Sequence, residues 1–265
     1  MKKISIYCVN YNSYEYLAAF IKSVDAAASK VGGEAVVTVF VADNTEDNIR
    51  PIDANENVAT VKVFAYNKNL GYFGAVKRMM REAPPVDSDF VIISNVDVVM
   101  DEDALVKLCG LRLRDDVGWI APQIYSTSEN RDRNPKIVNR YSLRKLRLLR
   151  LLFKYPLLNM LYKATLYKRK KLQTHVAGEI YGGHGSFIIL TKEYYKRCGC
   201  IDYPVFLFGE EIYLAEQCLR SKLKVVYEPE VRVVDSDHAS TGKMPSRFYC
   251  KCNAEALGYI IRTFY

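Results

Sequence analysis

The sequence lacks any apolar run long enough to span a membrane as a helix, although 49% of its 265 residues are hydrophobic. It also lacks a secretory signal, because the apolar run near its N-terminus is too short. Its seven cysteines are an odd number without an export signal, which is typical of free thiols in a reducing compartment. These absences argue against an integral membrane protein and against a disulfide scaffold, and they predict a cytoplasmic protein.

Acidic residues are missing from one long stretch, since no Asp or Glu occurs between Asp132 and Glu179. Residues 133–171 within it hold 13 of the 38 Lys and Arg residues. The rest of the chain has 25 basic against 30 acidic side chains, so the net charge of +8 comes from this stretch alone. We therefore expect a mildly acidic domain that carries a basic insert over residues 133–178.

The remaining composition is that of a globular protein, with 26% charged residues and a length that suits one sizeable domain. Strand-forming stretches alternate with stretches whose apolar residues recur at helical spacing. Strands are predicted over 3–9, 35–42, 60–65, from 90 onward and over 117–122, with helices over 13–29, up to 82 and over 103–113. The first helix should begin after Ser13 as its N-cap and bury Tyr16, Leu17, Phe20, Ile21 and Val24. This alternation predicts an α/β fold with a parallel sheet covered by helices on both faces.

Residues 90–100 begin as a continuous apolar run, which is typical of a strand buried on both faces. Ser94, Asn95 and Asp97 come where this strand should emerge, and ligands bind at the carboxyl ends of strands in open α/β sheets. A carboxylate among apolar neighbours needs a partner. That partner is either a divalent cation that carries diphosphate oxygens, or the start of the next helix, which Asp97 would cap.

Polar residues follow the other predicted strands in the same way. Asn10 and Asn12 come after the first strand. Asp43 comes after the second, where an acidic side chain often contacts the ribose or base of a nucleoside but also suits a turn. In the loop 69–74, Gly71 would let the backbone approach a ligand ahead of a helix N-terminus, which favours anions. This loop lacks the strict glycine fingerprint of dinucleotide-binding proteins.

A series of short segments in a fixed order resembles a known family. The segments are 10–12, 43–44, 69–74, 94–97, 182–188, 206–214 and 234–238. They resemble the family 2 glycosyltransferases of the GT-A fold, and within them the bacterial rhamnosyltransferase-like group. The resemblance implies one GT-A domain over residues 1–265, with a Rossmann-like, mixed and mostly parallel sheet. It further implies a nucleotide-sugar-binding half over 1–122, an acceptor and catalytic half over 179–265, and a strand of small residues at 182–188.

The resemblance implies that Asp43 reads the nucleoside of a nucleotide-diphosphate sugar. Asp97 would bind a divalent metal, Mn²⁺ or Mg²⁺, on the diphosphate, and His238 would be a second ligand. The other donor-site residues that it implies are Asn10, Asn12, Asn69, Gly71 and Asn95. After the glycine loop, Val76 and Lys77 depart from the family, which often has Asn at these positions, and Lys77 could instead help to neutralise phosphate. Lys77 also suits a solvated helix face.

The resemblance also implies that Glu211 deprotonates the acceptor hydroxyl, and direct displacement with one base inverts the anomeric centre. The family usually has Asp at this position, and the extra methylene of Glu211 would move the base by about an ångström. Glu210 is then the alternative base. Both acids equally suit the first turn of a helix that runs to Arg220, without any chemistry.

These features predict an inverting glycosyltransferase that extends a saccharide acceptor, lipid-linked and destined for a bacterial surface polysaccharide. Two other functions stay open. Glu211, where the family usually has Asp, would suit a GT-A-like protein that binds a nucleotide sugar or a glycan without turnover. A sugar nucleotidyltransferase would share the fold type but release diphosphate from a nucleoside triphosphate.

The insert interleaves basic residues with leucines over 140–171, and Pro156 interrupts its helical pattern. A basic, leucine-rich, interrupted helix suits the surface of an anionic membrane. A contact between two copies of the chain is the second interpretation. Nucleic acid is the third, because so many leucines are unusual on a face that follows phosphates. We therefore expect a peripheral protein on the inner face of the cell membrane.

Overall fold

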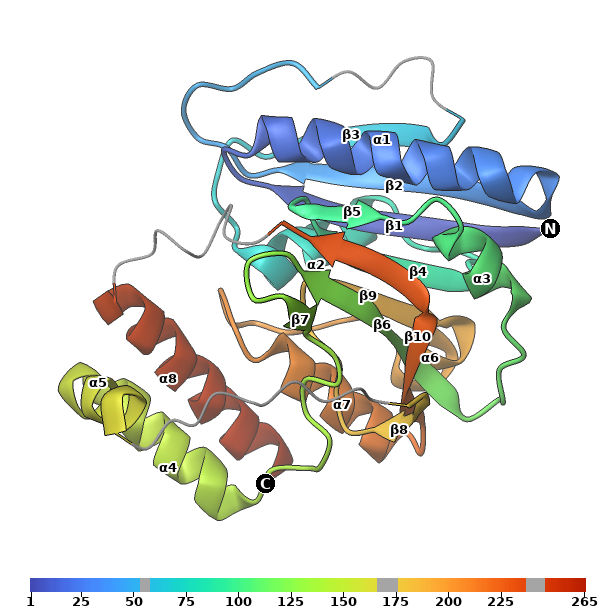
Figure 1. Cartoon of the computed structure of the whole chain (residues 1–265). Helices are drawn as coiled ribbons and strands as arrows, with labels where there is room; N and C mark the ends of the chain where they lie inside the picture. The colour runs from blue at the N-terminus through green and yellow to red at the C-terminus, as the bar shows by residue number, and fades with distance from the viewer. Residues whose placement is uncertain (53–57, 166–175, 237–245) are drawn as a thin grey trace.

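The structure is a computed structural model that describes residues 1–52, 58–165, 176–236 and 246–265 (Figure 1). Within these residues, a ten-stranded sheet has the order β3-β2-β1-β4-β9-β6-β10-β5, while β7 pairs with β6 and β8 with β10. The strands are β1 (Lys2–Asn10), β2 (Ala35–Asp43), β3 (Thr60–Ala65), β4 (Phe90–Asn95), β5 (Val98–Met100), β6 (Val117–Ser126), β7 (Arg131–Asp132), β8 (Gly178–Ile180), β9 (Phe187–Thr191) and β10 (Lys224–Asp235). The helices are α1 (Tyr14–Val31), η1 (Gly32–Glu34, 3₁₀), α2 (Tyr72–Glu82), α3 (Ala104–Gly110), α4 (Leu143–Lys154), α5 (Pro156–Thr165), α6 (Lys192–Cys198), α7 (Glu210–Arg220) and α8 (Ser246–Phe264).

Strands β3, β2, β1 and β4 form the parallel part of the sheet. Their apolar side chains are buried in two clusters, one on each face. The register places Asn10 beside Asp43, and Val9 beside Asn95. The polar residues that follow these strands therefore lie along one edge of the sheet. The predicted parallel arrangement is confirmed for this part of the chain.

Helices cover both faces of the sheet (Figure 1). Helices α1 and α3 bury residues such as Phe20 and Leu105 against one face. Helices α2, α7 and α8 bury residues such as Phe73, Leu214 and Ile260 against the other. The second layer places the start of α7 near the start of α2, which positions the site described below.

Helix α1 begins directly after Ser13, as predicted, but the Ser13 hydroxyl donates to the Tyr11 carbonyl at 3.0 Å instead of capping the helix. Most of its predicted apolar face is buried, namely Leu17, Phe20, Ile21 and Val24. The prediction was wrong for Tyr16, which is exposed. The face against the sheet is centred on Leu17 and Val24, so Tyr16 falls beside it.

Strand β4 ends at Asn95, where the sequence predicts it to emerge. The chain then turns at Asp97, and β5 pairs antiparallel with β10. Asp103 occupies the N-cap position of α3, so the interpretation of Asp97 as the cap of this helix was wrong. Strand β9 enters between β4 and β6, antiparallel to both. The sheet is therefore mixed, as the predicted fold class requires.

The glycine-rich residues 182–186 form a loop, and β9 begins only at Phe187. The prediction of a strand from residue 182 was therefore wrong in this part. The loop lies directly on β6, since a Cβ on Gly183 would stand 2.7 Å from the Ala121 Cβ. This close approach of backbone to side chains explains why small residues occur here.

The insert forms two helices that meet at Pro156, as predicted. Helix α4 packs along α8, and its Leu146 is fully buried. Leu149 and Phe153 pack against the same core cluster. The inner face of α4 therefore belongs to the core of the protein. No helix in the described ranges is both long and apolar enough to cross a bilayer.

Candidate active site

The carboxyl ends of β1 and β2 hold Asp43 in a closed hydrogen-bond network. The buried Asp43 carboxylate accepts from Asn10 Nδ2 at 3.0 Å, Tyr14 Oη at 2.9 Å and Thr45 N at 3.1 Å. Asn10 Oδ1 in turn accepts from Ser13 N at 3.1 Å. The structure thus brings Asn10 and Asp43 together, and Asn10 fixes the orientation of the carboxylate.

The glycine loop before α2 is tied to the same edge. The Asn69 side chain accepts a hydrogen bond from Gly71 N at 3.0 Å, and Asn44 Nδ2 donates to the Gly71 carbonyl at 3.0 Å. The buried Asn44 Oδ1 has no hydrogen-bond donor within the described part of the chain. A buried acceptor without a partner beside a predicted nucleotide site suits a ligand N–H group or a bridging water.

Gly71 joins the two halves of the chain. Its φ of 72° lies in the left-handed region, and a Cβ there would stand 2.1 Å from the Phe206 carbonyl oxygen. Tyr72 N donates to the same oxygen at 3.3 Å. A side chain at Gly71 would push away the segment that leads from Phe206 to α7. Glycine is therefore required here by packing as well as by backbone conformation.

Asp97 lies in the turn between β4 and β5, with 6% of its surface exposed. Its carbonyl accepts a hydrogen bond from Ser236 N at 2.9 Å, which fastens the turn to the end of β10. A buried carboxylate is a hard oxygen donor of the kind that Mg²⁺ and Mn²⁺ prefer, so Asp97 fits the predicted metal.

The predicted second metal ligand, His238, lies outside the described residues. Among the residues that are described, no group of three or more His, Cys, Asp or Glu is placed to hold a metal. A metal ion bound by Asp97 would therefore need further ligands from the donor diphosphate, from water or from His238.

Two left-handed residues set the start of α7. Phe208 has a φ of 68° and Gly209 a φ of 84°, and a bulky residue rarely adopts a positive φ. Tyr203 Oη donates to the Phe208 carbonyl at 2.6 Å and packs over Gly209. This turn leaves 6% of the Glu210 surface exposed, while the next residue, Glu211, is half-buried.

Burial raises the pKa of Glu210 to about 8, and the neighbouring Glu211 carboxylate adds to the rise. Glu210 is therefore mostly protonated at neutral pH, and a protonated carboxyl cannot take a proton from an acceptor hydroxyl. Glu211 is the member of the pair that solvent and a substrate can reach. The chemistry favours Glu211 over Glu210 as a base.

Tyr72 lies among the carboxylates of both halves of the chain. Its hydroxyl donates to the Gly185 carbonyl at 3.0 Å. Burial raises the pKa of Tyr72 well above its ordinary value, and the charges of Glu210, Asp97 and Glu211 raise it further. Gly185 faces the second acid of α7, since a Cβ there would stand 3.3 Å from Glu211 Oε1. Asp97 and Glu211, which are far apart in the sequence, thus both raise the pKa of one tyrosine.

His184 lies on the same glycine-rich loop. Its Nδ1 accepts a hydrogen bond from Ser186 N at 3.1 Å, which leaves the ring proton on Nε2. Burial holds the pKa of His184 well below its ordinary value, and the positive charges of Lys136, Arg133 and Arg131 lower it further. The ring is therefore neutral at physiological pH and can donate one hydrogen bond.

The other predicted donor-site residues are spread more widely. Asn95 N donates to the Ser186 carbonyl at 2.9 Å, which joins the end of β4 to the glycine-rich loop. Asn12 is exposed just beyond β1, with a φ of 53°. The Lys77 ammonium, in contrast, forms an ion pair with Asp202 on the side of α2.

The predicted site leaves out four residues at this edge: Tyr14, Asn44, Tyr72 and His184. The last three lie in segments that carry the family resemblance, but no role was predicted for them. Tyr14 and Tyr72 share a usable signal, because each is the first residue of a helix that follows a strand end. A hydroxyl-bearing aromatic at that position can reach back over the strand ends. Asn44 directly follows β2, but its contact with Gly71 depends on tertiary structure that the sequence does not show.

A family profile described as Glycosyl transferase family 2 matches residues 5–176, which is more than half of the chain. No curated protein matches the chain.

Solved structures with a similar fold include two of TarS from S. aureus. One has a TM-score of 0.57 at 13% identity, over 89% of this chain and 37% of that chain. The other, TarS 1–349 in complex with UDP-GlcNAc, has a TM-score of 0.56 at 11% identity, over 100% of this chain and 67% of that chain. A structure of GalNAc-T7 with UDP, GalNAc and Mn²⁺ has a TM-score of 0.58 at 13% identity, over 92% of this chain and 45% of that chain.

At these identities the likeness shows the fold, and the predicted GT-A-type architecture is confirmed. The chain spans less than half the length of the TarS and GalNAc-T7 chains in two of these structures.

Proposed function

Because the chain belongs to glycosyl transferase family 2, we propose that it is an inverting glycosyltransferase that uses a nucleotide-diphosphate sugar. The glycine-rich loop carries this proposal, because the Ser186 carbonyl of the loop accepts a hydrogen bond from Asn95 N at the end of β4 at 2.9 Å, while a Cβ on its Gly185 would stand 3.3 Å from Glu211 Oε1. In this proposal Asp97 would be the metal-binding carboxylate and Glu211 the base, near the edge where Asp43 is held. Sugar transfer needs these parts within one substrate length of each other.

The donor would lie along the carboxyl edge of β1, β2 and β4. Asp43 would read the nucleoside, with Asn10 and Tyr14 holding its carboxylate in place. Asn44 Oδ1, which has no partner among the described residues, and the Gly71 backbone lie next to this network and would face the donor. The structures of TarS 1–349 with UDP-GlcNAc and of GalNAc-T7 with UDP support this donor class.

Asp97 would hold a divalent cation, Mn²⁺ or Mg²⁺. When bound, such a metal stabilises the negative charge on the leaving diphosphate as a Lewis acid. The Mn²⁺ in the GalNAc-T7 structure supports a divalent metal as the cofactor. His238 stays a predicted second ligand.

Glu211 would accept the proton of the acceptor hydroxyl. The acceptor oxygen then forms a bond to the anomeric carbon while the bond from that carbon to the diphosphate breaks, with inversion. The extra methylene of Glu211 has room, because Gly185 has no side chain where the carboxylate lies. The neutral Glu210 would limit repulsion beside the ionised base.

The acceptor in this proposal is a lipid-linked saccharide of a bacterial surface polysaccharide, and the enzyme would belong to the rhamnosyltransferase-like group that the sequence resembles. The insert supports a position on the inner face of the cell membrane. Its basic residues Arg144, Arg147 and Arg150 are exposed, and so are its Leu148 and Leu151.

A panel of nucleotide sugars, incubated with Mn²⁺, with Mg²⁺ or with a chelator, tests the proposal. We expect one donor to release its nucleoside diphosphate only when both metal and acceptor are present. Donor binding without transfer to any saccharide would favour the non-catalytic protein. Release of inorganic diphosphate from a nucleoside triphosphate would favour the nucleotidyltransferase.

A further inference from the structure

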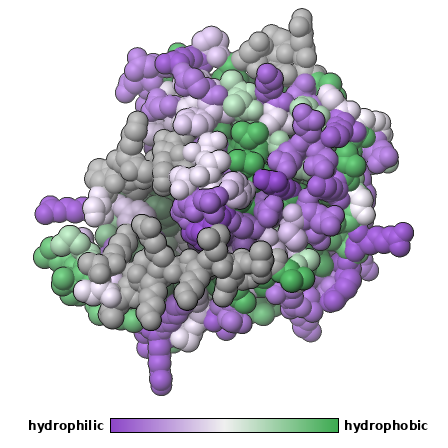
Figure 2. Space-filling model, in the orientation of Figure 1, coloured by the Kyte–Doolittle hydropathy of each residue, from purple (hydrophilic) through white to green (hydrophobic). Residues whose placement is uncertain are grey.

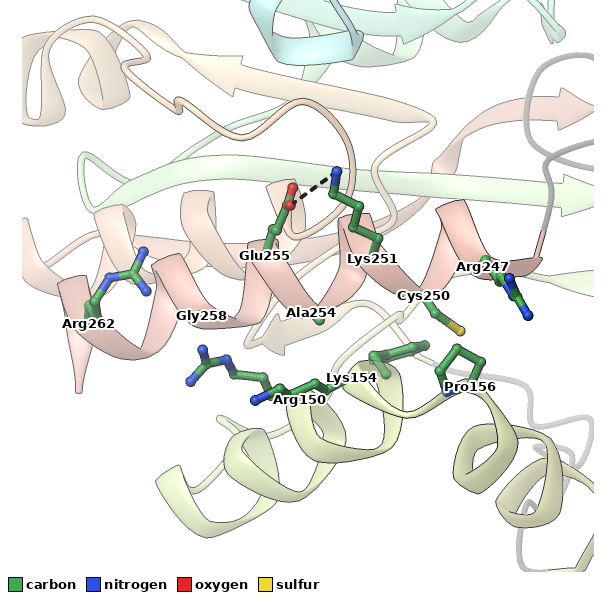
Figure 3. Close-up of a pocket in the computed structure, with 11 residues that line it drawn as sticks. Arg150, Lys154, Pro156, Arg247, Cys250, Lys251, Ala254, Glu255, Gly258 and Arg262 are labelled. Carbon is green, nitrogen blue, oxygen red and sulfur yellow. Dashed lines mark ion pairs between the residues drawn. The ribbon is translucent and has the colours of Figure 1, made fainter.

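A groove of about 410 Å³ lies between α4 and α8, outside the residues of the candidate active site (Figure 3). Five of its lining side chains are basic: Arg150 and Lys154 from α4, and Arg247, Lys251 and Arg262 from α8. Glu255 is its acidic lining residue. The groove therefore carries a strong net positive charge, which none of the proposed catalytic steps uses.

Two guanidinium groups converge over a glycine in this groove. A Cβ on Gly258 would stand 3.2 Å from Arg150 Nε and 3.4 Å from Arg262 Nη1. Figure 3 shows the two arginines on either side of Gly258, one from each helix. Like charges at this spacing repel each other, and an oxyanion between them would replace the repulsion with charge-assisted hydrogen bonds.

The acidic residue of the groove does not neutralise this pair. Glu255 forms its ion pair with Lys251 at 4.0 Å, marked by the dashed line in Figure 3. Within the described residues, Arg150, Arg247 and Arg262 form no ion pair with a carboxylate. The groove is thus positively charged, and its three arginines have no carboxylate partner in the described part of the chain.

Exposed apolar side chains lie beside the groove. Helix α5 begins at Pro156, which lines the groove, and Leu157 next to it is 73% exposed. Met160 and Leu161 on the same helix are also exposed, and Figure 2 shows apolar surface where α5 lies. Basic groups with exposed apolar groups next to them suit the boundary of a membrane, where the basic groups meet lipid phosphates and the apolar groups meet acyl chains.

We propose that this groove binds the phosphate of an anionic phospholipid headgroup, while the exposed side chains of α5 enter the adjoining apolar layer. The phosphate would lie over Gly258 between Arg150 and Arg262, where the missing side chain leaves room. This inference rests on the proposed attachment to a membrane but does not depend on sugar transfer. It replaces a diffuse basic surface by a defined site.

The test compares two double variants with the same change of charge. Arg150→Gln with Arg262→Gln empties the groove of its converging pair. Arg144→Gln with Arg147→Gln removes two exposed charges of α4 that do not line the groove. The probes are short-chain phosphatidylglycerol below its micelle concentration, followed by NMR titration, and flotation with phosphatidylglycerol-containing vesicles.

We expect the groove variant to bind short-chain phosphatidylglycerol about 30-fold more weakly, since each basic group near an anionic lipid contributes about fivefold. The control variant should bind the short-chain lipid as the wild type does, although it should lose part of the attraction to whole vesicles, because Arg144 and Arg147 lie on the exposed basic surface of α4. Gly258→Leu should weaken binding as well without any change of charge, because its side chain fills the place of the phosphate. Melting curves verify that each variant is folded, and nucleotide-sugar binding is followed in parallel.

Several results would overturn the inference. These are equal binding by the groove and control variants, full binding by Gly258→Leu, or binding of inorganic phosphate as tight as that of the lipid. Wild-type protein that ignores anionic vesicles at low salt while it dimerises through α4 and α8 would assign the groove to a second copy. If the wild-type protein binds the lipid but transfers no sugar, the proposed enzyme is contradicted, whereas the proposed lipid site in the groove is supported.

Discussion

The strand-end site and the groove between α4 and α8 both gather charged side chains, but they hold them in opposite ways. At the strand ends, Asp43 is buried with three hydrogen-bond donors, and burial keeps Glu210 largely protonated. In the groove, Arg150 and Arg262 are exposed, without an acidic partner in the described ranges. Buried charges must be paired or neutralised, whereas exposed charges are screened by water and salt and can stay unpaired until a ligand binds.

The comparison also divides the insert itself. Its first basic residue in the membrane interpretation, Arg140, forms a two-point ion pair with Glu216 at 2.7 and 2.9 Å. Tyr181 and Tyr265 donate to the same carboxylate at 2.6 and 3.0 Å. Arg140 is thus part of the folded structure, while the exposed basic residues of α4 can contact a membrane surface. Position in a basic stretch does not by itself decide what a charge does.

The largest effect should come from the strand-end site. Asp97→Ala should lower metal-dependent sugar transfer by about three orders of magnitude, because it removes the protein's carboxylate from the metal that stabilises the leaving group. Isothermal titration of Mn²⁺ and donor, beside a turnover assay, measures both consequences. Wild-type activity in this variant, together with indifference to chelator, would contradict the metal assignment.

The pair on α7 allows a sharper test of the site. Glu211→Gln should retain donor affinity but lose about 100-fold or more in turnover, because general-base catalysis contributes about 10²–10⁴-fold. Glu210→Gln is the matched control, and it should lose much less because Glu210 is already protonated at neutral pH. Donor binding and single-turnover rates separate the two effects. If the losses are reversed, Glu210 is the base.

Burial of Glu210 should also appear in the pH dependence of stability. The folded protein keeps this proton up to pH about 8, whereas the unfolded chain loses it near the ordinary pKa of 4.5. Its contribution to stability is complete below pH 4.5 and falls as pH rises, by up to about 1.4 kcal/mol per pH unit. Glu210→Gln should therefore gain stability relative to wild type between pH 5 and pH 8, as urea unfolding at several pH values would show. Parallel stability curves would mean that Glu210 ionises normally in the fold.

Arg140 should behave as a core residue rather than as a membrane contact. Arg140→Gln leaves Glu216, which is 1% exposed, without its cation. We expect a loss of about 2 kcal/mol in the free energy of unfolding, reduced from the value for a fully buried pair because Arg140 itself is 43% exposed. Arg144→Gln removes an exposed charge of the same insert and should change stability by less than about 0.5 kcal/mol. Equal unfolding curves for the two variants would contradict the claim that Arg140 stabilises the fold while Arg144 does not.

The smallest effect is expected at Lys77. Its exposed ion pair with Asp202 contributes about 0–1 kcal/mol to stability, and Lys77→Gln should leave donor affinity within about twofold of wild type if that pair is its role. Titration with the donor measures this directly. A tenfold or larger loss of affinity would instead place Lys77 on the phosphates, as its charge next to the glycine loop allows.

The sequence by itself determined the fold class, since apolar runs such as β4 and helical patterns such as α1 are short-range signals. It also determined that Asn10, Asp43, Asn95 and Asp97 lie at or just beyond strand ends. In a parallel sheet this places them at one edge, whichever order the strands take. The interruption of the insert at Pro156 was likewise readable, because proline cannot donate the hydrogen bond that a continuing helix needs.

Only the tertiary structure decided which charges are buried and which are exposed. Glu210 and Glu211 are adjacent and alike in sequence, yet the left-handed turn at Phe208 and Gly209 buries one and leaves the other half-buried. Arg140 and Arg150 belong to the same basic stretch, yet one meets Glu216 and the other faces a groove. Burial and pairing depend on contacts between residues far apart in the chain. The ionisation of a side chain follows from that environment, so it could not be read from the residue type.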